Sequence, residues 1–196
     1  VYGESAPYGE KKVINATTVP QPANFYGDSK LQADVAVREL ADDTYKVIVL
    51  RPPMIYGKDS KGNYRTLAKL AKKLPIFPDV DNERSMLYIE NLCEFLCQIM
   101  LLKPYHRNSV VLLPQNGEWT KTSDMVKEIA KASGKKIVEL KCLAPAVKIG
   151  SKMTCKIGGL VNKAFGNNCY MFAVSNYNGI KYQNISMKQS VMEMNS

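Results

Sequence analysis

Short apolar runs and helical periodicities alternate along the chain, and together they predict its elements. The densest run spans residues 45–50, is rich in β-branched side chains and ends at Arg51, Pro52 and Pro53. Its length and density are typical of a buried parallel strand. Other short apolar runs predict further strands, at 76–78, 85–89, 110–113 and 137–140.

Apolar residues that recur every three or four positions predict the helices. The first helix is expected over about 24–41, where Leu31, Val35 and Leu40 fall near one face and Asp34 points elsewhere.

A second helix is expected around 67–74, with lysines on its outer face, and a strongly apolar third helix runs to about residue 102. A fourth is expected to begin at a Thr122 or Ser123 cap and to end with Gly134 just beyond its C-terminus.

The other segments carry weaker patterns. Residues 4–23 and 54–62 are expected to be loops, and after about residue 143 the pattern is helical and irregular, with a last helix near 187–194. Strands that alternate with helices predict an α/β protein. The part up to about residue 53 is expected to form the end of a parallel sheet, and the later part a smaller mixed region over the strand ends.

Composition fits a globular protein of one domain, or one domain with a small appendage. The chain has 196 residues, of which 45% are apolar and 23% charged. Its net charge of +9 suits an anionic partner, but the lysines are scattered, with no run longer than two. We therefore expect a solvated lysine surface and no nucleic-acid partner.

The cysteines and the histidine argue against a metal site. Five cysteines are present without a CxxC pair, and Cys93 and Cys97 are expected on the buried side of a helix as reduced core thiols. His106 is the only histidine and lies in an expected loop, which also argues against a Ser-His-Asp hydrolase. The sequence has no apolar run of about 18 residues or more. We expect a cytoplasmic protein with no metal and no membrane partner.

One short stretch, YGDSK at residues 26–30, combines two residues that can carry chemistry. Tyr26 and Lys30 are four positions apart, so they share a helix face. An ammonium near a phenol stabilises the phenolate and lowers the phenol pKa, so that the phenol can exchange protons near neutral pH. This suits the oxidation of a hydroxyl by hydride transfer, although the same spacing also occurs on solvated helix faces.

The context of this pair carries a family resemblance. In order, the chain contains VYG at 1–3, YGDSK at 26–30, LRPPMIYG at 50–57 and RSMLYIENL at 84–92. This series resembles the extended short-chain dehydrogenase/reductase superfamily, in its NAD-dependent epimerase/dehydratase branch that acts on nucleotide sugars. The resemblance covers residues 1 to about 102 and continues faintly in the tail, at NKAFGN.

The resemblance implies roles at the cofactor. Tyr26 corresponds to the general acid/base, and Lys30 to the lysine that lowers the tyrosine pKa and hydrogen-bonds the nicotinamide ribose. Pro52, Pro53 and Met54 belong to the turn that lies beside the nicotinamide ring.

Four further residues are implied at the substrate. Tyr56 is expected where the nicotinamide and sugar pockets meet. Arg84 corresponds to the arginine that pairs with the nucleotide-sugar diphosphate, and a planar guanidinium suits phosphate oxygens. Asn63 or Asn82 is expected to contact the nucleotide or the sugar, and the sequence does not choose between them.

Several family features have no counterpart in this chain. The sequence lacks a GxxGxxG or GxGxxG turn for the dinucleotide and an acidic residue for the adenine ribose. The catalytic Ser or Thr that the family places before VYG would precede Val1. We expect a truncated protein in which residues 1–57 are the remnant of a Rossmann NAD-binding domain. Residues 58–196 are expected to be mainly the substrate-binding region, with some elements returning to the Rossmann sheet.

The expected function is that of an NAD- or NADP-dependent nucleotide-sugar epimerase, similar to UDP-sugar 4-epimerases and serving polysaccharide synthesis. The full-length form is expected to be a homodimer, and the isolated chain to be inactive. A reductase or dehydratase of the same superfamily is the alternative, and a non-catalytic binding protein is the alternative from a different class.

Overall fold

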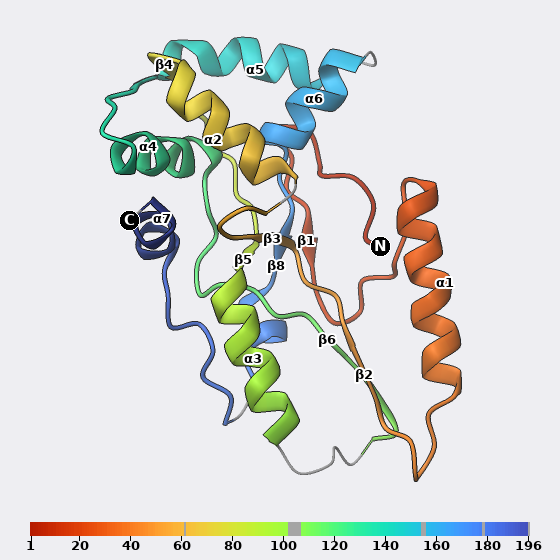
Figure 1. The fold of residues 1–196 in the computed structure, drawn as a ribbon. Coiled ribbons are helices and arrows are strands. Elements are labelled where there is room, and N and C mark those ends of the chain that lie inside the picture. Colours follow the sequence, from red (N-terminus) through yellow and green to blue (C-terminus); the bar gives the residue numbers. More distant parts are fainter. Residues whose placement is uncertain (61, 102–106, 154–155, 178, 196) are drawn as a thin grey trace.

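The computed structural model describes residues 1–60, 62–101, 107–153, 156–177 and 179–195, and Figure 1 shows how their elements are arranged. The helices are α1 (Phe25–Glu39), α2 (Asn63–Lys73), α3 (Ile89–Leu101), α4 (Thr122–Ala132), α5 (Ala144–Ser151), α6 (Lys156–Phe165) and α7 (Met187–Asn195). The strands are β1 (Val13–Ile14), β2 (Val47–Leu50), β3 (Met54–Tyr56), β4 (Ile76–Pro78), β5 (Met86–Tyr88), β6 (Ser109–Leu112), β7 (Val138–Leu140) and β8 (Cys169–Tyr170).

These strands form four parallel pairs, which confirms the α/β class. β2 pairs with β6 in the register Val47 to Ser109, and β1 with β8, β3 with β5 and β4 with β7. Parallel strands need long connections, and here the connections carry helices.

The main core lies between α2, α4 and α7. Tyr56 and Tyr88 of β3 and β5 pack there against Met125 and Ile129 of α4 and Val191 of α7. The amphipathic pattern of α2 is confirmed, because Tyr64, Leu67 and Ala71 are buried in this core while its lysines face solvent. A second cluster lies under α3.

Two strands lie where loops were expected. β1 falls within residues 4–23 and β3 within 54–62. Each is only two or three residues long and is defined by its distant partner, β8 or β5, so no local periodicity reveals it.

The prediction that Thr122 or Ser123 caps α4 is also wrong. Its N-cap is Lys121, and neither Thr122 nor Ser123 caps it, because both side chains are buried and bonded to other segments. Gly134, at φ +70°, follows the C-cap Ser133 as predicted.

The prediction that Cys93 and Cys97 are core thiols is wrong, since both are exposed. The buried positions of α3 are Asn91, Phe95 and Ile99, and residues two positions further on point to the opposite side. His106 and Cys155 lie outside the described residues.

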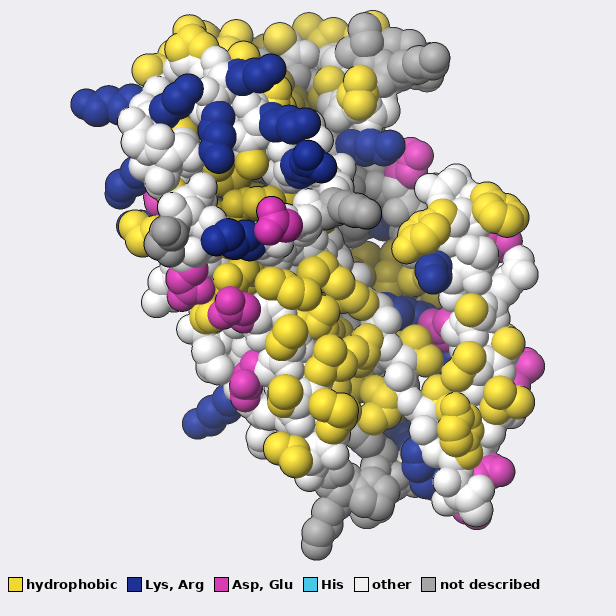
Figure 2. Space-filling view, viewed as in Figure 1, with side chains coloured by type: hydrophobic (Ala, Val, Ile, Leu, Met, Phe, Trp, Pro, Cys, Tyr) yellow, Lys and Arg dark blue, Asp and Glu magenta, His cyan; other side chains and the backbone are white. Residues whose placement is uncertain are grey.

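The apolar face predicted for helix α1 is not its buried face, and the helix buries a carboxylate instead. Val35 and Leu40 are exposed, whereas Asp34 is the buried residue. Figure 2 shows apolar side chains over the outer faces of both α1 and α3. No helix among the described residues is both long enough and apolar enough to cross a membrane.

Candidate active site

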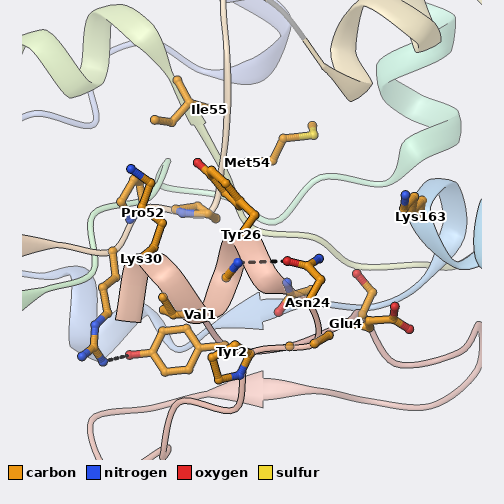
Figure 3. Close-up of a pocket in the computed structure, with 18 of the residues that line it drawn as sticks. Val1, Tyr2, Glu4, Asn24, Tyr26, Lys30, Pro52, Met54, Ile55 and Lys163 are labelled. Atoms are coloured by element: carbon orange, nitrogen blue, oxygen red, sulfur yellow. Dashed lines mark hydrogen bonds between the residues drawn. The ribbon is translucent and has the colours of Figure 1, made fainter. Parts of the chain in front are cut away.

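A pocket of about 690 Å³ lies between the start of α1, the end of β2, the N-terminal residues and α6. It brings together seven of the nine predicted site residues, namely Tyr26, Lys30, Pro52, Pro53, Met54, Asn63 and Arg84. In Figure 3, Tyr26 and Lys30 project from α1, and Lys163 of α6 lies on another side of the pocket. Segments distant in the sequence therefore share one cavity.

Tyr26 and Lys30 share one face of α1, as their spacing predicts. The Lys30 Nζ lies 5.7 Å from the centroid of the Tyr26 ring, and the Tyr26 side chain is 70% exposed. The helix begins just before this pair because Asn24 caps it, with its Oδ1 accepting a hydrogen bond from the Gly27 N–H at 2.9 Å. The phenol and the ammonium are thus presented to the pocket on the first turns of a capped helix.

A chain of charged contacts fixes α1 against the end of β2. Arg51 Nε donates to Asp34 at 2.7 Å, and Arg51 Nη1 donates to the Tyr2 hydroxyl at 2.9 Å. Arg38 Nε donates to the other Asp34 oxygen at 2.6 Å. Burial alone would raise the pKa of the Asp34 carboxyl, but the hydrogen bonds and charges of Arg51 and Arg38 outweigh it and lower that pKa.

Arg84 lies deep in the pocket wall, with its guanidinium under the end of α6. Its Nη1 donates to the carbonyl oxygens of Lys163 and of Ala164, the latter at 3.1 Å. Cations are favoured at helix C-termini, where carbonyl groups lack helical partners. Burial lowers the pKa of Arg84. The arginine therefore joins α6 to the pocket wall as well as facing the cavity.

Two predicted site residues are not among the pocket residues. Tyr56 is fully buried, and its hydroxyl hydrogen-bonds Ser190 Oγ at 2.9 Å and Asn116 Nδ2 at 3.1 Å. Asn82 is also fully buried and hydrogen-bonds the Thr122 hydroxyl and backbone at the start of α4. In this structure both side chains are engaged in the packing of the core. Of the two asparagines that the sequence left open, Asn63 is the one that lines the pocket.

Sequence reasoning missed several residues that shape the pocket. Asp34 and Tyr2 hold Arg51 in place, and Asn162 and Lys163 line the cavity from α6. The last two lie in the NKAFGN stretch, the faint part of the resemblance, which was their only signal. Nothing local marks Asp34, because its partner Arg51 belongs to another element.

The pocket residues suit one end of a dinucleotide. A phenol and an ammonium lie beside the turn of Pro52, Pro53 and Met54, an arrangement suited to a ribose and a flat ring. The sequence offers no glycine-rich turn for the pyrophosphate. Within the described residues, no group of three or more His, Cys, Asp or Glu side chains is placed to hold a metal ion.

In a comparison with known families, residues 1–109 match the model of the NAD dependent epimerase/dehydratase family. Among curated proteins, the chain is 33% identical over 118 residues to a UDP-glucose 4-epimerase of Vibrio cholerae, covering 58% of this chain and 35% of that protein.

A second curated relative is the N-acetyl-alpha-D-glucosaminyl-diphospho-ditrans,octacis-undecaprenol 4-epimerase of Escherichia coli O157:H7. It is 35% identical over 80 residues, which cover 38% of this chain and 24% of that protein. The matches thus span about a third or less of the curated relatives' length.

Solved structures share the fold. The UDP-glucuronic acid 4-epimerase of Bacillus cereus, in complex with NAD, superposes with a TM-score of 0.66 at 16% identity, covering 96% of this chain and 57% of that one. RMD from Pseudomonas aeruginosa, complexed with NADPH, gives a TM-score of 0.66 at 16% identity, with coverage of 100% and 63%. At these identities the likeness extends to the fold alone.

Proposed function

The chain belongs to the NAD dependent epimerase/dehydratase family, and from this premise we propose that it contributes the proton-transfer half of a nucleotide-sugar 4-epimerase. The observation that carries the proposal is the position of Tyr26 and Lys30 on one face of α1, lining the same pocket as Pro52 and Arg84. The names of the curated relatives support 4-epimerisation over reduction or dehydration, which remain the alternatives.

We propose that residues 1–57 belong to the cofactor-binding domain and that 58–196 form mainly the substrate region. The cofactor is NAD or NADP, and its part is to accept a hydride from the sugar and return it. Pro52, Pro53 and Met54 would lie beside its ring, and Lys30 would hydrogen-bond its ribose. We expect the isolated chain to be inactive, since its residues fit only this end of the dinucleotide, and the native protein to act as a homodimer.

In the proposed mechanism, the Tyr26 hydroxyl exchanges a proton with the sugar 4-hydroxyl. As phenolate, Tyr26 removes the proton when C4 is oxidised, and it returns the proton once the sugar has turned over and C4 is reduced on its other face. The nearby Lys30 ammonium stabilises the phenolate charge. Tyr26 is the second residue of a capped helix, so the cap fixes the backbone from which its phenol projects to the pocket.

Opposite α1, cationic side chains would hold the substrate. Arg84 and Lys163 line the pocket and are suited to a diphosphate, with Asn63 as a hydrogen-bonding partner for the sugar or nucleotide. Two predicted substrate contacts, Tyr56 and Asn82, would instead support the site from the core.

Replacing Tyr26 by Phe in the native protein tests this proposal. The turnover of UDP-glucose to its 4-epimer should fall by about 10²–10⁴-fold, the usual contribution of a positioned acid/base. Tyr45→Phe is the matched control, because Tyr45 is an exposed tyrosine that does not line the pocket, and it should leave turnover unchanged. Full activity of Tyr26→Phe would refute the acid/base role.

A second substrate class has its own support. The E. coli relative is named for a sugar that is joined through diphosphate to undecaprenol, a membrane lipid. We therefore include lipid-linked sugar diphosphates beside nucleotide sugars, since both present a diphosphate to Arg84. A non-catalytic binding protein, the candidate from another class, would bind a UDP-sugar without the Tyr26-dependent turnover.

A further inference from the structure

A second cavity, of about 540 Å³, borders the contacts that hold α1 against the end of β2. Arg38 of α1 and Arg51 line it together with the loop of residues 16–20, and we call it the arginine pocket. Its volume falls in the range of small-molecule sites, roughly 300–1,000 Å³. Arg51 and Tyr2 also line the candidate active site, so the two cavities share a wall.

The arginine pocket carries an excess of positive charge. Among the described residues, its lining includes two arginines and no Asp or Glu. In the part of the chain that the structure describes, both arginines form an ion pair with the same carboxylate, Asp34, and each takes one of its oxygens. Two guanidinium charges therefore share a single carboxylate charge, and one positive charge is left uncompensated beside the cavity.

Both arginines keep N–H donors for a ligand. Within the described chain, Arg38 donates through Nε alone, to Asp34 at 2.6 Å, so its two Nη atoms have no described partner. Arg51 uses Nε for Asp34 and Nη1 for the Tyr2 hydroxyl, a bond drawn in Figure 3, and its Nη2 is likewise without a described partner. The Arg38 side chain is 32% exposed and that of Arg51 10%, so neither is fully solvated. The planar fork of a guanidinium matches the two oxygens of a carboxylate.

The rest of the lining suits an apolar group. Three aliphatic side chains border the cavity opposite the loop, namely Val111, Leu113 and Val174. On the loop itself, the hydroxyls of Thr17 and Thr18 donate to Asn15 Oδ1 at 2.8 and 3.0 Å, so their protons are already used. The polar anchors of the arginine pocket are thus its two arginines, and they face an apolar wall.

We propose that the arginine pocket binds a small organic carboxylate, with the carboxylate between Arg38 and Arg51 and the apolar part against Val111 and Leu113. A monoanion matches the single uncompensated positive charge, and its two oxygens match the free N–H groups of the two guanidiniums. A phosphate dianion would exceed that charge. The site is separate from the proposed catalytic pair, which does not line this cavity.

A bound carboxylate connects two elements. Arg38 lies in the last turn of α1, and Arg51 follows the last residue of β2. A carboxylate between them ties the end of the helix that carries Tyr26 to the end of the strand. A ligand that binds only the docked arrangement stabilises it by mass action. Occupancy of the arginine pocket therefore favours the docked position of α1.

Benzoate and benzamide test the proposal, because they have nearly the same shape and only benzoate is charged at neutral pH. In an NMR titration of the 196-residue chain, benzoate should shift the amide signals of residues 16–20, Arg38 and Arg51 in a saturable way. Its Kd should be lower than that of benzamide by about tenfold or more. Arg38→Gln, and separately Thr17→Asp, which places a carboxylate on the lining, should each weaken benzoate by about tenfold. Arg65→Gln on the exposed side of α2 removes the same charge and should leave the Kd unchanged.

Amide exchange supplies a second measurement. Benzoate, and not benzamide, should slow the exchange of α1 amides, because only the carboxylate ties α1 to the end of β2. Arg38→Gln also removes a contact of Asp34, so its effect on binding includes any loosening of α1. Thr17→Asp leaves that contact in place and keeps the test independent of the stability of the helix.

Saturable shifts at the arginine pocket that both pocket variants weaken, together with slower α1 exchange, support the proposal. Equal affinity for benzoate and benzamide, no saturable shifts, or shifts centred on Tyr26 and Lys30 overturn it. Full benzoate affinity of Thr17→Asp, equal losses in Arg38→Gln and Arg65→Gln, or binding without slower α1 exchange also overturn it. These measurements need no turnover, so their result does not depend on the proposed function.

Discussion

Helices α1 and α4 are held in place by different kinds of contact. α4 buries Met125, Val126, Ile129 and Ala130 in a core shared with α2 and α7. α1 buries Asp34, which the ion pair to Arg51 attaches beside the end of β2, and Arg38 of the same helix binds the other Asp34 oxygen. The helix that carries the candidate catalytic pair therefore depends on a few polar contacts, whereas the helix away from the pocket depends on apolar packing.

From this difference we infer that α1 and α4 can unfold separately. Segments with few buried apolar contacts open locally at a lower free-energy cost than the global transition. We expect α1 to open by such a local route and α4 only with global unfolding. The predictions below separate these routes, from the largest effect to the smallest.

Ile129→Ala should have the largest effect on stability. Truncating a fully packed aliphatic side chain leaves a cavity and should lower the free energy of unfolding by about 2–5 kcal/mol. Urea denaturation measures this, and amide exchange should speed up in α4 and change little in α1. Lys131→Ala, on the exposed side of the same helix, is the control. If α1 amides accelerate as much as α4 amides, the two helices form one cooperative unit and the comparison fails.

Asp34→Asn should act mainly on α1. It removes the acceptor charge from two arginines and leaves Arg51 half-buried without its ion partner, at a local cost of about 3 kcal/mol. Exchange of α1 amides should accelerate strongly while α4 stays protected. Asp28→Asn on the exposed first turn of α1 should change stability by no more than about 0.5 kcal/mol. Equal effects of the two substitutions would show that the buried ion pair does not anchor the helix.

Acid and alkali should loosen different regions. The pKa of Asp34 is lowered below its ordinary 3.8, so its charge stabilises the fold above that pH, and the contribution is lost as pH falls through the lowered value. Burial, the main cause, raises the pKa of Tyr64 from 10.0 to about 12, so its contribution is present below pH 10 and lost as pH rises towards 12.

These pH effects are the smallest that we expect, and NMR spectra of the backbone amides recorded across the pH range test them. Signals of α1 should change first on acidification, and signals of α2 and α4 first in alkali. Asp34→Asn should remove the acid sensitivity of α1, and Tyr64→Phe should reduce the alkaline sensitivity of the core. An acid response of α1 that survives in Asp34→Asn would assign it to other carboxylates.

Elements with a strong local pattern were predictable from the sequence. The amphipathic spacing of Leu67, Leu70, Ala71 and Leu74 located α2, although the helix begins earlier, at Asn63. The ordered motifs led to the pocket residues of α1 and of the turn after β2. The motifs alone do not establish the catalytic or binding role of each pocket residue, and these roles stay predictions.

Features that depend on distant partners were not predictable. Asp34 is buried because Arg51 reaches it from another element, and the guanidinium of Arg84 lies under α6 far along the chain. Cys93 and Cys97 were misplaced because α3 is apolar on its outer side too, so its sequence does not reveal which face turns inward.

The parallel pairing of β1 with β8 has a consequence for how the chain acquires its fold. Val13 pairs with Cys169, and Tyr2 packs edge-on against Tyr170, so the first residues contact some of the last. Contacts between such distant residues carry a large loop-closure cost and slow folding. During synthesis, β1 has no partner until Tyr170 has left the ribosome. We expect the N-terminal wall of the pocket to be the last part of it to assemble.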